Sequence, residues 1–392
     1  MSVMGCVLHA LLISSIHAGV ELGDHTAGGY TPFEMIAPAC LTSGSRELAV
    51  VVNTEQNKTL SPTYTGGDFY FFSGIIRPVF VTELPCTGDP YISRVEPTTV
   101  DAVRGILNLR VVMHAGLCPP SQLPATVHLA VGFHGASPGQ PQEYPVVDGA
   151  AVISSLQVPQ PWAPWTVAGP NGSGRNASLV QITVLEGASG DTVSVRTGIR
   201  VVAIDRSRAR ITINGEVVKL LGFNRHTMWP DTGAAVTPAQ EAVDMELLIR
   251  ANVNYIRGAH YPQSQSWLDL CDENGVAMWE ETLGPGTSVS DMTNAAFMKA
   301  HLEAVGSMVE TSIAHPSVIL HGFFNEGPSD NVDACVGYAA SAEAVRSRVS
   351  VPASRLVTWA NNHLGSDKCM AVSDEAVLWR VNKPPLPLAT PT

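Results

Sequence analysis

The sequence has 392 residues, enough for two or three domains, and its formal net charge is −12. Hydrophobic residues make up 45% and charged residues 15%, which describes a globular chain and excludes a disordered one. No lysine- or arginine-rich stretch offsets the negative charge, and no apolar run reaches the roughly 18 residues of a membrane helix. We therefore expect neither a nucleic acid nor a membrane as partner.

The N-terminal residues 7–16 are largely apolar, and Ile16-His17-Ala18 resembles a weak signal-peptide cleavage site. No lysine or arginine precedes this stretch, so we favour a β-strand over a cleaved signal, which remains the alternative. Three N-x-S/T sequons, at Asn57, Asn171 and Asn176, are usable only in a secretory compartment. The sequence leaves localisation open between secreted and cytoplasmic.

The seven cysteines are odd in number and widely spaced, and none forms a CxxC pair. This spacing predicts neither a zinc site nor a disulfide framework.

The first half of the chain predicts antiparallel strands. Apolar residues alternate with other residues in 107–113, 127–133, 180–184 and 193–195. A period of two with turn residues between the runs is typical of half-buried strands in a β-sandwich. We expect the segment 159–174, rich in Pro, Gly and Trp, to be a loop excursion on this scaffold.

From about Ile211 the pattern changes to strands that alternate with helices, which indicates β/α units around a parallel sheet. The apolar run 217–223 predicts a strand buried on both faces. Thr237 as N-cap, Pro238 and Gln240 predict a helix start. Further strands are expected at 252–256, 276–279, 317–324 and 356–359, and helices at 266–274, around 298–309 and at 332–349.

The number of these units is small. We expect about five from Val217 onward, with room for a sixth strand near 370–377, whereas a closed barrel has eight. The proline-rich segment 382–392 does not resemble a barrel strand.

Polar side chains follow four of the expected strands, at the ends where barrel enzymes bind their substrates. They suit a polyhydroxylated ligand, and a strand-end glutamate suits acid/base chemistry. Structural roles are the alternatives: Arg257 neutralises Glu281, His226 and His260 are hydrogen-bonded core residues, and a strand-end glutamate forms a loop ion pair. The four strand ends read Asn224-Arg225-His226, Arg257 to Pro262, Glu280-Glu281 and Asn325-Glu326-Gly327-Pro328.

Two long motifs carry a family resemblance. Asn254 to Pro262, followed by Trp267-Leu268, Asp272 and Gly275-Val276, is similar to the first signature of glycoside hydrolase family 2, the β-galactosidase/β-glucuronidase family. The stretch from His315 to Glu326 is similar to the second signature. Shorter matches resemble the family's jelly-roll, immunoglobulin-like and barrel-entry segments: 28–33, 74–77, 191–200, 213–215 and 221–226.

The resemblance implies a retaining β-glycosidase that acts on a terminal β-linked sugar. Glu326 would be the general acid/base, and Asn325 would bond the sugar 2-hydroxyl. Arg257, His260, His226 and Glu281 would line the sugar subsite. We expect a carbohydrate substrate and no cofactor, and the oligomeric state stays unknown.

The sequence also departs from the family. A retaining mechanism needs a second carboxylate, which in this family follows the seventh strand. After Glu326 the only glutamates are Glu343 and Glu375, and neither matches the nucleophile motif. We therefore expect a chain truncated at both ends, without a nucleophile and with impaired catalysis. Residues 282–286 lack the family's magnesium ligands, so no metal is expected, and His321 stands where the family has tryptophan.

The predicted fold is multidomain β plus α/β. Residues 1–90 would form a jelly-roll-like remnant, 91–204 an immunoglobulin-like β-sandwich and 205–392 an incomplete (β/α)₈ TIM barrel. The predicted function is that of a glycosidase, and the alternatives are a non-catalytic carbohydrate-binding protein or an incomplete gene product.

Overall fold

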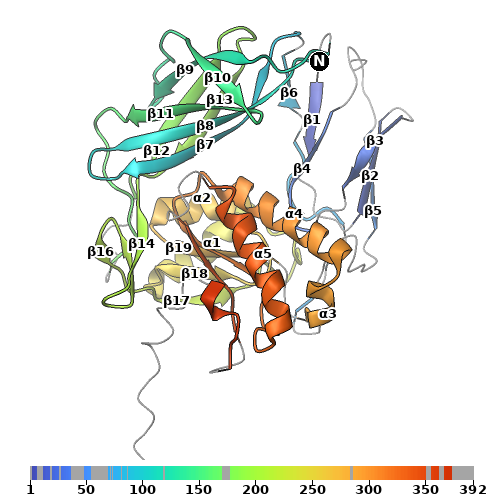
Figure 1. Cartoon of the computed structure of the whole chain (residues 1–392), viewed down its shortest axis with the longest axis vertical. Coiled ribbons are helices and arrows are strands. Elements are labelled where there is room, and N and C mark those ends of the chain that lie inside the picture. The colour runs from blue at the N-terminus through green and yellow to red at the C-terminus, as the bar shows by residue number, and fades with distance from the viewer. Residues whose placement is uncertain are drawn as a thin grey trace, which may run out of the picture.

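A computed structural model describes the N-terminal part in short segments and most of the remaining chain. Figure 1 shows small N-terminal sheets, an antiparallel part with strands β7 to β13, and a parallel sheet covered by helices. The described residues are 2–6, 12–17, 20–25, 28–36, 48–53, 69–85 except 71, 73 and 81, and 87–372 except 118–119, 170–176, 283–285, 350–354 and 362–365.

Two small antiparallel sheets lie at the N-terminal end. The first joins β1 (Ser2–Cys6) to β4 (Phe33–Met35) and β6 (Thr82–Glu83). The second joins β2 (Leu12–His17) to β3 (Val20–His25) and β5 (Leu48–Asn53). The strand expected within 7–16 is confirmed at residues 12–16, while residues 7–11 lie outside the described part. That these sheets form a jelly roll stays a prediction.

The expected alternating strands are confirmed in the next part of the chain. Along β8 every second side chain is buried, and Leu107, Leu109 and Val111 form part of the core with Ile182. The seven strands follow the order β13-β12-β9-β10-β11-β8-β7, and β13 also contacts β7, so the sheet curls around this core. They are β7 (Tyr91–Asp101), β8 (Ile106–His114), β9 (Thr126–Phe133), β10 (Gln142–Val147), β11 (Ala150–Gln157), β12 (Val180–Glu186) and β13 (Thr192–Thr197).

A small antiparallel sheet leads into the parallel one. It consists of β14 (Val202–Asp205), β15 (Arg210–Ile213) and β16 (Glu216–Val217). Five parallel strands follow, each next to its predecessor in the chain, as the β/α pattern predicted. They are β17 (Gly222–Arg225), β18 (Tyr255–Gly258), β19 (Ala277–Thr282), β20 (Val318–Phe323) and β21 (Leu356–Thr358).

Local signals in the sequence set the helix ends. Thr237 caps the first helix in a capping box with Gln240, as predicted. Gly275, at φ 62°, ends the second helix in the left-handed conformation that glycine adopts readily. The helices are α1 (Pro238–Arg250), α2 (Gln265–Asn274), α3 (Val289–Met292), α4 (Ala295–Ser312), α5 (Cys335–Arg346) and the 3-10 turns η2 (Val332–Ala334) and η4 (Met370–Val372).

The prediction of a strand over 217–223, buried on both faces, is wrong. Val217 belongs to β16, and the parallel strand begins at Gly222. Phe223 is 60% exposed, because β17 is the edge strand of the described sheet and pairs there only with β18. A Cβ on Gly222 would lie 1.5 Å from the Tyr255 carbonyl oxygen, so the close approach of the two strands requires glycine.

The sixth strand suggested near 370–377 is not found where the chain is described. Residues 370–372 form η4, and 373–377 lie outside the described residues. In the described residues, no helix has the length and apolarity needed to cross a membrane.

In the predicted excursion 159–174, residues 165 and 168 contact α2 and its C-terminal cap. The Trp165 side chain is fully buried, and its indole N–H donates to the Asp272 carbonyl oxygen over 2.9 Å. Ala168 N–H donates to the Gly275 carbonyl oxygen over 2.7 Å. The segment thus joins the antiparallel part to α2, although residues 170–174 lie outside the described part.

Candidate functional site

Arg257, at the end of β18, is the centre of a buried polar network. Its guanidinium donates to both carboxylate oxygens of Glu281, with distances of 2.7 to 3.0 Å, and to Asn325 Oδ1 over 2.5 Å. It also lies 3.4 Å from Asn224 Oδ1 and 5.0 Å from the centroid of the Trp279 ring. These contacts join the C-terminal ends of four neighbouring strands.

Glu281 and His260 complete the network. Glu281 is fully buried, and its Oε1 lies 2.9 Å from His260 Nδ1. A buried carboxylate is stable only when it is paired, and Arg257 and His260 supply that pairing. The alternative structural role of Arg257, to neutralise Glu281, is therefore observed. Because Arg257 also reaches Asn325, the same ion pair fixes the strand end next to Glu326.

Glu326 has a different environment. Its side chain is exposed and forms no hydrogen bond or ion pair with another residue that the structure describes. The loop ion pair considered as an alternative is thus not found for Glu326 among those residues. This carboxylate remains accessible to a ligand at the rim of the sheet.

The backbone around Glu326 is held in an unusual conformation. Phe324 and Glu326 have φ angles of 52° and 53°, which are rarely adopted by residues other than glycine. Such residues cost about 1–3 kcal/mol each and occur often at functional sites. Glu326 N–H donates to the Ala360 carbonyl oxygen over 2.8 Å, and Gly327 N–H to the Phe324 carbonyl oxygen over 3.0 Å.

His226, which directly follows β17, lies beside the network. Its ring centroid is 5.2 Å from that of His260, at an interplanar angle of 78°. Phe69 from the N-terminal part lies 4.9 Å from the His226 ring centroid. All six predicted site residues therefore lie along the ends of β17 to β20.

Sequence reasoning missed contributions from other segments. Asn224 and Trp279 both contact Arg257, but neither was predicted as a site residue. Asn224 belongs to a strand-end motif, and Trp279 directly precedes Glu280-Glu281. Tyr30 stacks on Tyr261 with ring centroids 4.2 Å apart. Arg77 donates to the Gln263 carbonyl oxygen over 2.6 Å, and burial lowers its pKa to about 10. Tyr30 and Arg77 belong to the segments 28–33 and 74–77, which resemble the family's jelly-roll domain. The sequence does not indicate that these segments contact the loop after β18.

Glu280 is buried beneath the rim, on the other face of β19 from Glu281. Its Oε1 accepts a hydrogen bond from Gln263 N–H over 3.0 Å. Burial raises the pKa of this carboxyl, and the hydrogen bond from Gln263 and the positive charges of His315 and Arg77 only partly oppose it. Glu280 thus binds the backbone of the loop that follows β18.

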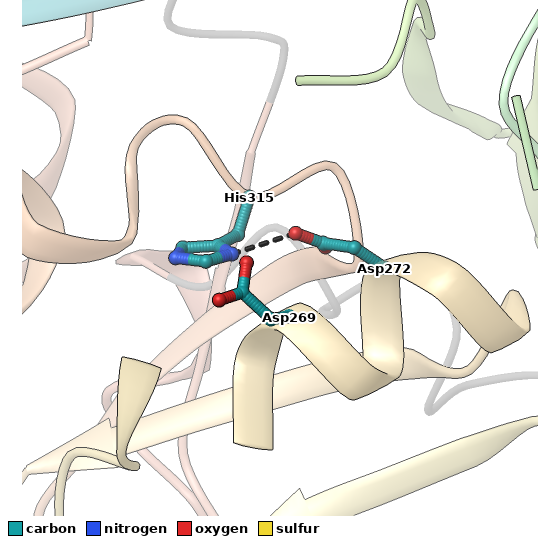
Figure 2. A group of neighbouring side chains, drawn as sticks. All are labelled: Asp269, Asp272 and His315. Carbon is teal, nitrogen blue, oxygen red and sulfur yellow. Dashed lines mark hydrogen bonds and ion pairs between the residues drawn. The ribbon is translucent and has the colours of Figure 1, made fainter. Parts of the chain in front are cut away.

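A second cluster of titratable groups lies between α2 and the turn before β20, away from the network. Figure 2 shows His315 directed at Asp272, with Asp269 beside them; the His315 Nδ1 to Asp272 Oδ2 distance is 2.6 Å. Burial lowers the pKa of His315, but the Asp272 carboxylate outweighs it and the pKa lies above its ordinary value. Asp272 Oδ1 accepts from Ser317 N–H, and Asp269 pairs with Arg196 at 2.8 Å.

These three residues are close enough to ligate a cation. Each is already engaged: the carboxylates by His315, Ser317 and Arg196, and His315 Nε2 by Gln265 at 3.1 Å. The bonds tie α2 to the turn before β20 and to the antiparallel part, which gives the cluster a structural role.

The absence of any disulfide signal in the sequence was misleading. Cys335, at the start of α5, is bonded to Cys369, and their Cα atoms are 5.0 Å apart. The separation of 34 residues is not a recognisable motif, so only the fold reveals the pair. Cys271 is a buried free cysteine.

A parallel sheet of β/α units with carboxylates, imidazoles and a guanidinium at its C-terminal rim is typical of (β/α) barrel enzymes. Residues 202–384 match the family model described as "Glycosyl hydrolases family 2, TIM barrel domain". This match places the β/α part of the chain in glycoside hydrolase family 2.

Named relatives agree with this family. The chain is 27% identical to a β-galactosidase of Thermoanaerobacter pseudethanolicus over 317 residues, 80% of this chain and 41% of that protein. It is 25% identical to the β-glucuronidase of Homo sapiens over 383 residues, 89% of this chain and 55% of that protein. The chain thus spans about half the length of these two relatives.

Solved structures agree on the fold. A family 2 β-galacturonidase of Eisenbergiella tayi bound to galacturonate superposes with a TM-score of 0.78 at 24% identity, covering 95% of this chain and 63% of that one. A β-glucuronidase of Bifidobacterium dentium in complex with coumarin-3-O-glucuronide gives a TM-score of 0.77 at 20% identity, covering 94% of this chain and 64% of that one.

Proposed function

We propose that this protein binds a terminal β-linked sugar at the C-terminal ends of β17 to β20. Glu326 is the general acid/base in this proposal, the role that the family resemblance implies for O-glycosyl hydrolysis by the retaining mechanism of intact relatives. The observation that carries the proposal is the contrast between two strand-end glutamates. Glu281 is buried in an ion pair, whereas Glu326 is exposed and held on a backbone of positive φ.

The recognition residues follow from the network. Arg257 is 7% and Asn325 3% exposed, and the bond between them leaves Asn325 with its amide N–H₂ group for a sugar hydroxyl. His260 and His226 form the wall next to them, and Phe69 adds an aromatic surface. Such a site, with few polar groups beside aromatic rings, suits a monosaccharide.

A second carboxylate about 5 Å from Glu326 is needed for retention. Glu281 is fully buried and shared between Arg257 and His260, so it is not free to attack an anomeric carbon. Glu343 is exposed on α5, and Glu375 lies outside the described residues. We propose that these 392 residues lack the nucleophile, and that they recognise the sugar better than they hydrolyse its glycosides.

The domain division belongs to the same proposal. Residues 1–90 are a jelly-roll-like unit, 91–204 an immunoglobulin-like sandwich, and 205–392 part of a (β/α)₈ barrel. The curled antiparallel sheet and the five sequential parallel strands support the last two assignments.

Sugar binding is tested by calorimetric titration of the full chain with galactose, glucuronate and mannose. We expect saturable binding of at least one sugar, and Asn325→Ala lowers its affinity about tenfold because it removes a hydrogen-bonding group. Arg206→Ala, an exposed residue away from the rim, is the matched control. Binding of none of the three sugars to folded protein contradicts the proposal.

Turnover of the nitrophenyl β-glycosides of the same sugars tests the role of Glu326. We expect slow hydrolysis, lowered further by Glu326→Gln by about 10²–10⁴-fold, because a general acid contributes that much. Glu303→Gln, on the exposed face of α4, leaves the rate unchanged. Fast turnover that survives Glu326→Gln refutes the role of Glu326 as general acid/base. Fast turnover that requires Glu326 refutes the proposal that this chain hydrolyses glycosides slowly.

A further inference from the structure

The Cys335–Cys369 disulfide contacts the residues that follow Glu326 in the chain. Cys335 is the first residue of α5 and half-buried, whereas Cys369, next to η4, is 1% exposed. Both sulfur atoms lie 3.7 Å from the Asn331 carbonyl oxygen. A disulfide sulfur has no proton, so these are packing contacts. The bond thus fastens the segment around Cys369 to the start of α5, which directly follows residues 327–334.

The segment 366–372 is also hydrogen-bonded to that loop. Lys368 N–H donates to the Ser329 carbonyl oxygen over 2.8 Å. Arg346, at the end of α5, donates to the Val372 carbonyl oxygen over 3.0 Å. Covalent and hydrogen bonds together hold this segment against α5 and the Glu326 loop.

Asp367 connects the disulfide to the end of β21. Its Oδ1 accepts from Cys369 N–H over 2.8 Å. Its Oδ2 accepts from Trp359 Nε1 over 3.1 Å and from Asn361 Nδ2 over 2.6 Å. A single carboxylate therefore fixes the residues on both sides of Ala360.

Ala360 is the residue whose carbonyl oxygen accepts the Glu326 N–H. The Trp359 ring packs on Tyr338 of α5, with centroids 4.6 Å apart, which keeps this strand end against the helix. A continuous path leads from the disulfide through Asp367 and Ala360 to the backbone of Glu326. Since that backbone is strained, its position depends on such supports.

We propose that Cys335 and Cys369 form a redox modification site that positions Glu326, and that Asp367 is the positioning residue between them. The catalytic consequence rests on the function proposed above, but the positioning does not. Oxidation converts two thiols to one disulfide and releases two electrons and two protons; a disulfide oxidant such as glutathione disulfide takes them up and becomes two thiols. Cys335 is the more exposed residue of the pair.

Peptide mapping without reductant, after incubation with glutathione disulfide, tests the bond itself. We expect a Cys335–Cys369 cross-linked peptide and free Cys271. Dithiothreitol lowers the melting temperature of the wild-type chain but not that of the double variant Cys335→Ser, Cys369→Ser, because only the former loses a covalent constraint. Two free thiols after oxidation, or an equal shift in both proteins, overturns the proposal.

Hydrogen exchange of the full chain tests the path to Glu326 without any sugar. Reduction should speed exchange of the Glu326 and Lys368 amides by about tenfold or more and leave β8 unchanged, since only local supports are lost. Asp367→Asn should speed exchange at Glu326 while mapping still finds the disulfide. Asp333→Asn, an exposed aspartate on the same loop, is the control and should change neither. Unchanged Glu326 exchange after both reduction and Asp367→Asn overturns the positioning role.

A kinetic comparison separates positioning from general stability. Asp367→Asn should lower the kcat of any Glu326-dependent turnover and leave KM within about twofold, because Arg257 and Asn325 are fixed by other bonds. A raised KM with unchanged kcat contradicts positioning of Glu326. If sugar binding and turnover both fail, the exchange results still decide the proposal.

Discussion

Three glutamates at neighbouring strand ends have three different environments. Glu281 is fully buried and paired with Arg257, Glu280 is buried with a hydrogen bond from Gln263, and Glu326 is exposed. The cost of moving a carboxylate from water, and what offsets it, differs in each case. Of the three, only Glu326 is accessible enough to exchange a proton with a ligand. Its environment, and not its residue type, therefore makes it the candidate general acid/base.

Replacement of Glu280 by glutamine should stabilise the protein at neutral pH. Burial raises the pKa of Glu280, so the folded protein binds this proton more tightly than the unfolded chain does. Ionisation of Glu280 therefore costs stability above the ordinary carboxyl pKa, and the glutamine variant avoids that cost. We therefore expect the glutamine variant to be more stable than the wild type at pH 7.

The gain should shrink as the pH falls toward the ordinary carboxyl pKa of 4.5, because both states then hold the proton. Thermal unfolding at pH 7 and pH 5 measures it, with the exposed Glu303→Gln as control. A gain that is the same at both pH values would contradict this account.

At the scale of single elements, local chemistry sets the helix ends more firmly than the strand ends. Thr237 and Gln240 satisfy each other's backbone N–H groups, and Asn294 accepts from two N–H groups at the start of α4. The start of β17 depends instead on distant residues: the Asn254 side chain accepts from Leu221 N–H over 2.8 Å, and Gly222 fits closely against Tyr255.

Loss of the Thr237 hydroxyl should weaken the first turn of α1. Thr237→Ala removes the acceptor of the Gln240 N–H and should cost about 1 kcal/mol, whereas Thr237→Ser keeps the hydroxyl and should cost little. Denaturant unfolding of the two variants measures the difference. Equal stability of the alanine and serine variants would show that the cap contributes nothing.

At the scale of the whole molecule, the antiparallel part and the β/α part share an interface that includes Trp165. This side chain packs with Ile319 and Leu320 of β20 and donates to the Asp272 carbonyl oxygen. Arg200, 5% exposed, donates to the Val318 carbonyl oxygen over 2.8 Å. These buried contacts couple the stability of the two parts.

Trp165→Ala should uncouple them. Truncation of a buried tryptophan costs about 3–5 kcal/mol, and the loss falls on the interface. We expect calorimetry to show two separate unfolding transitions, whereas Trp165→Phe, which loses the indole N–H but keeps most of the volume, retains a single transition at lower temperature. A single transition in the alanine variant would indicate that other contacts couple the parts.

The sequence by itself determined the strand and helix pattern of each half and six of the residues at the rim. The alternation in 107–113 and the cap at Thr237 are local patterns. Each strand-end motif is likewise a short contiguous stretch of the chain. Such signals arise from backbone geometry and nearest neighbours, so they can be found without tertiary contacts.

Only the tertiary structure decided which polar groups are buried together and which stay accessible. The exposure of Glu326 beside the buried Glu281, the docking of Trp165 on α2 and the pairing of Cys335 with Cys369 depend on contacts between segments 34 to 107 residues apart. Burial, pKa and covalent pairing are properties of the surroundings, and distant segments supply those surroundings only after the chain has folded.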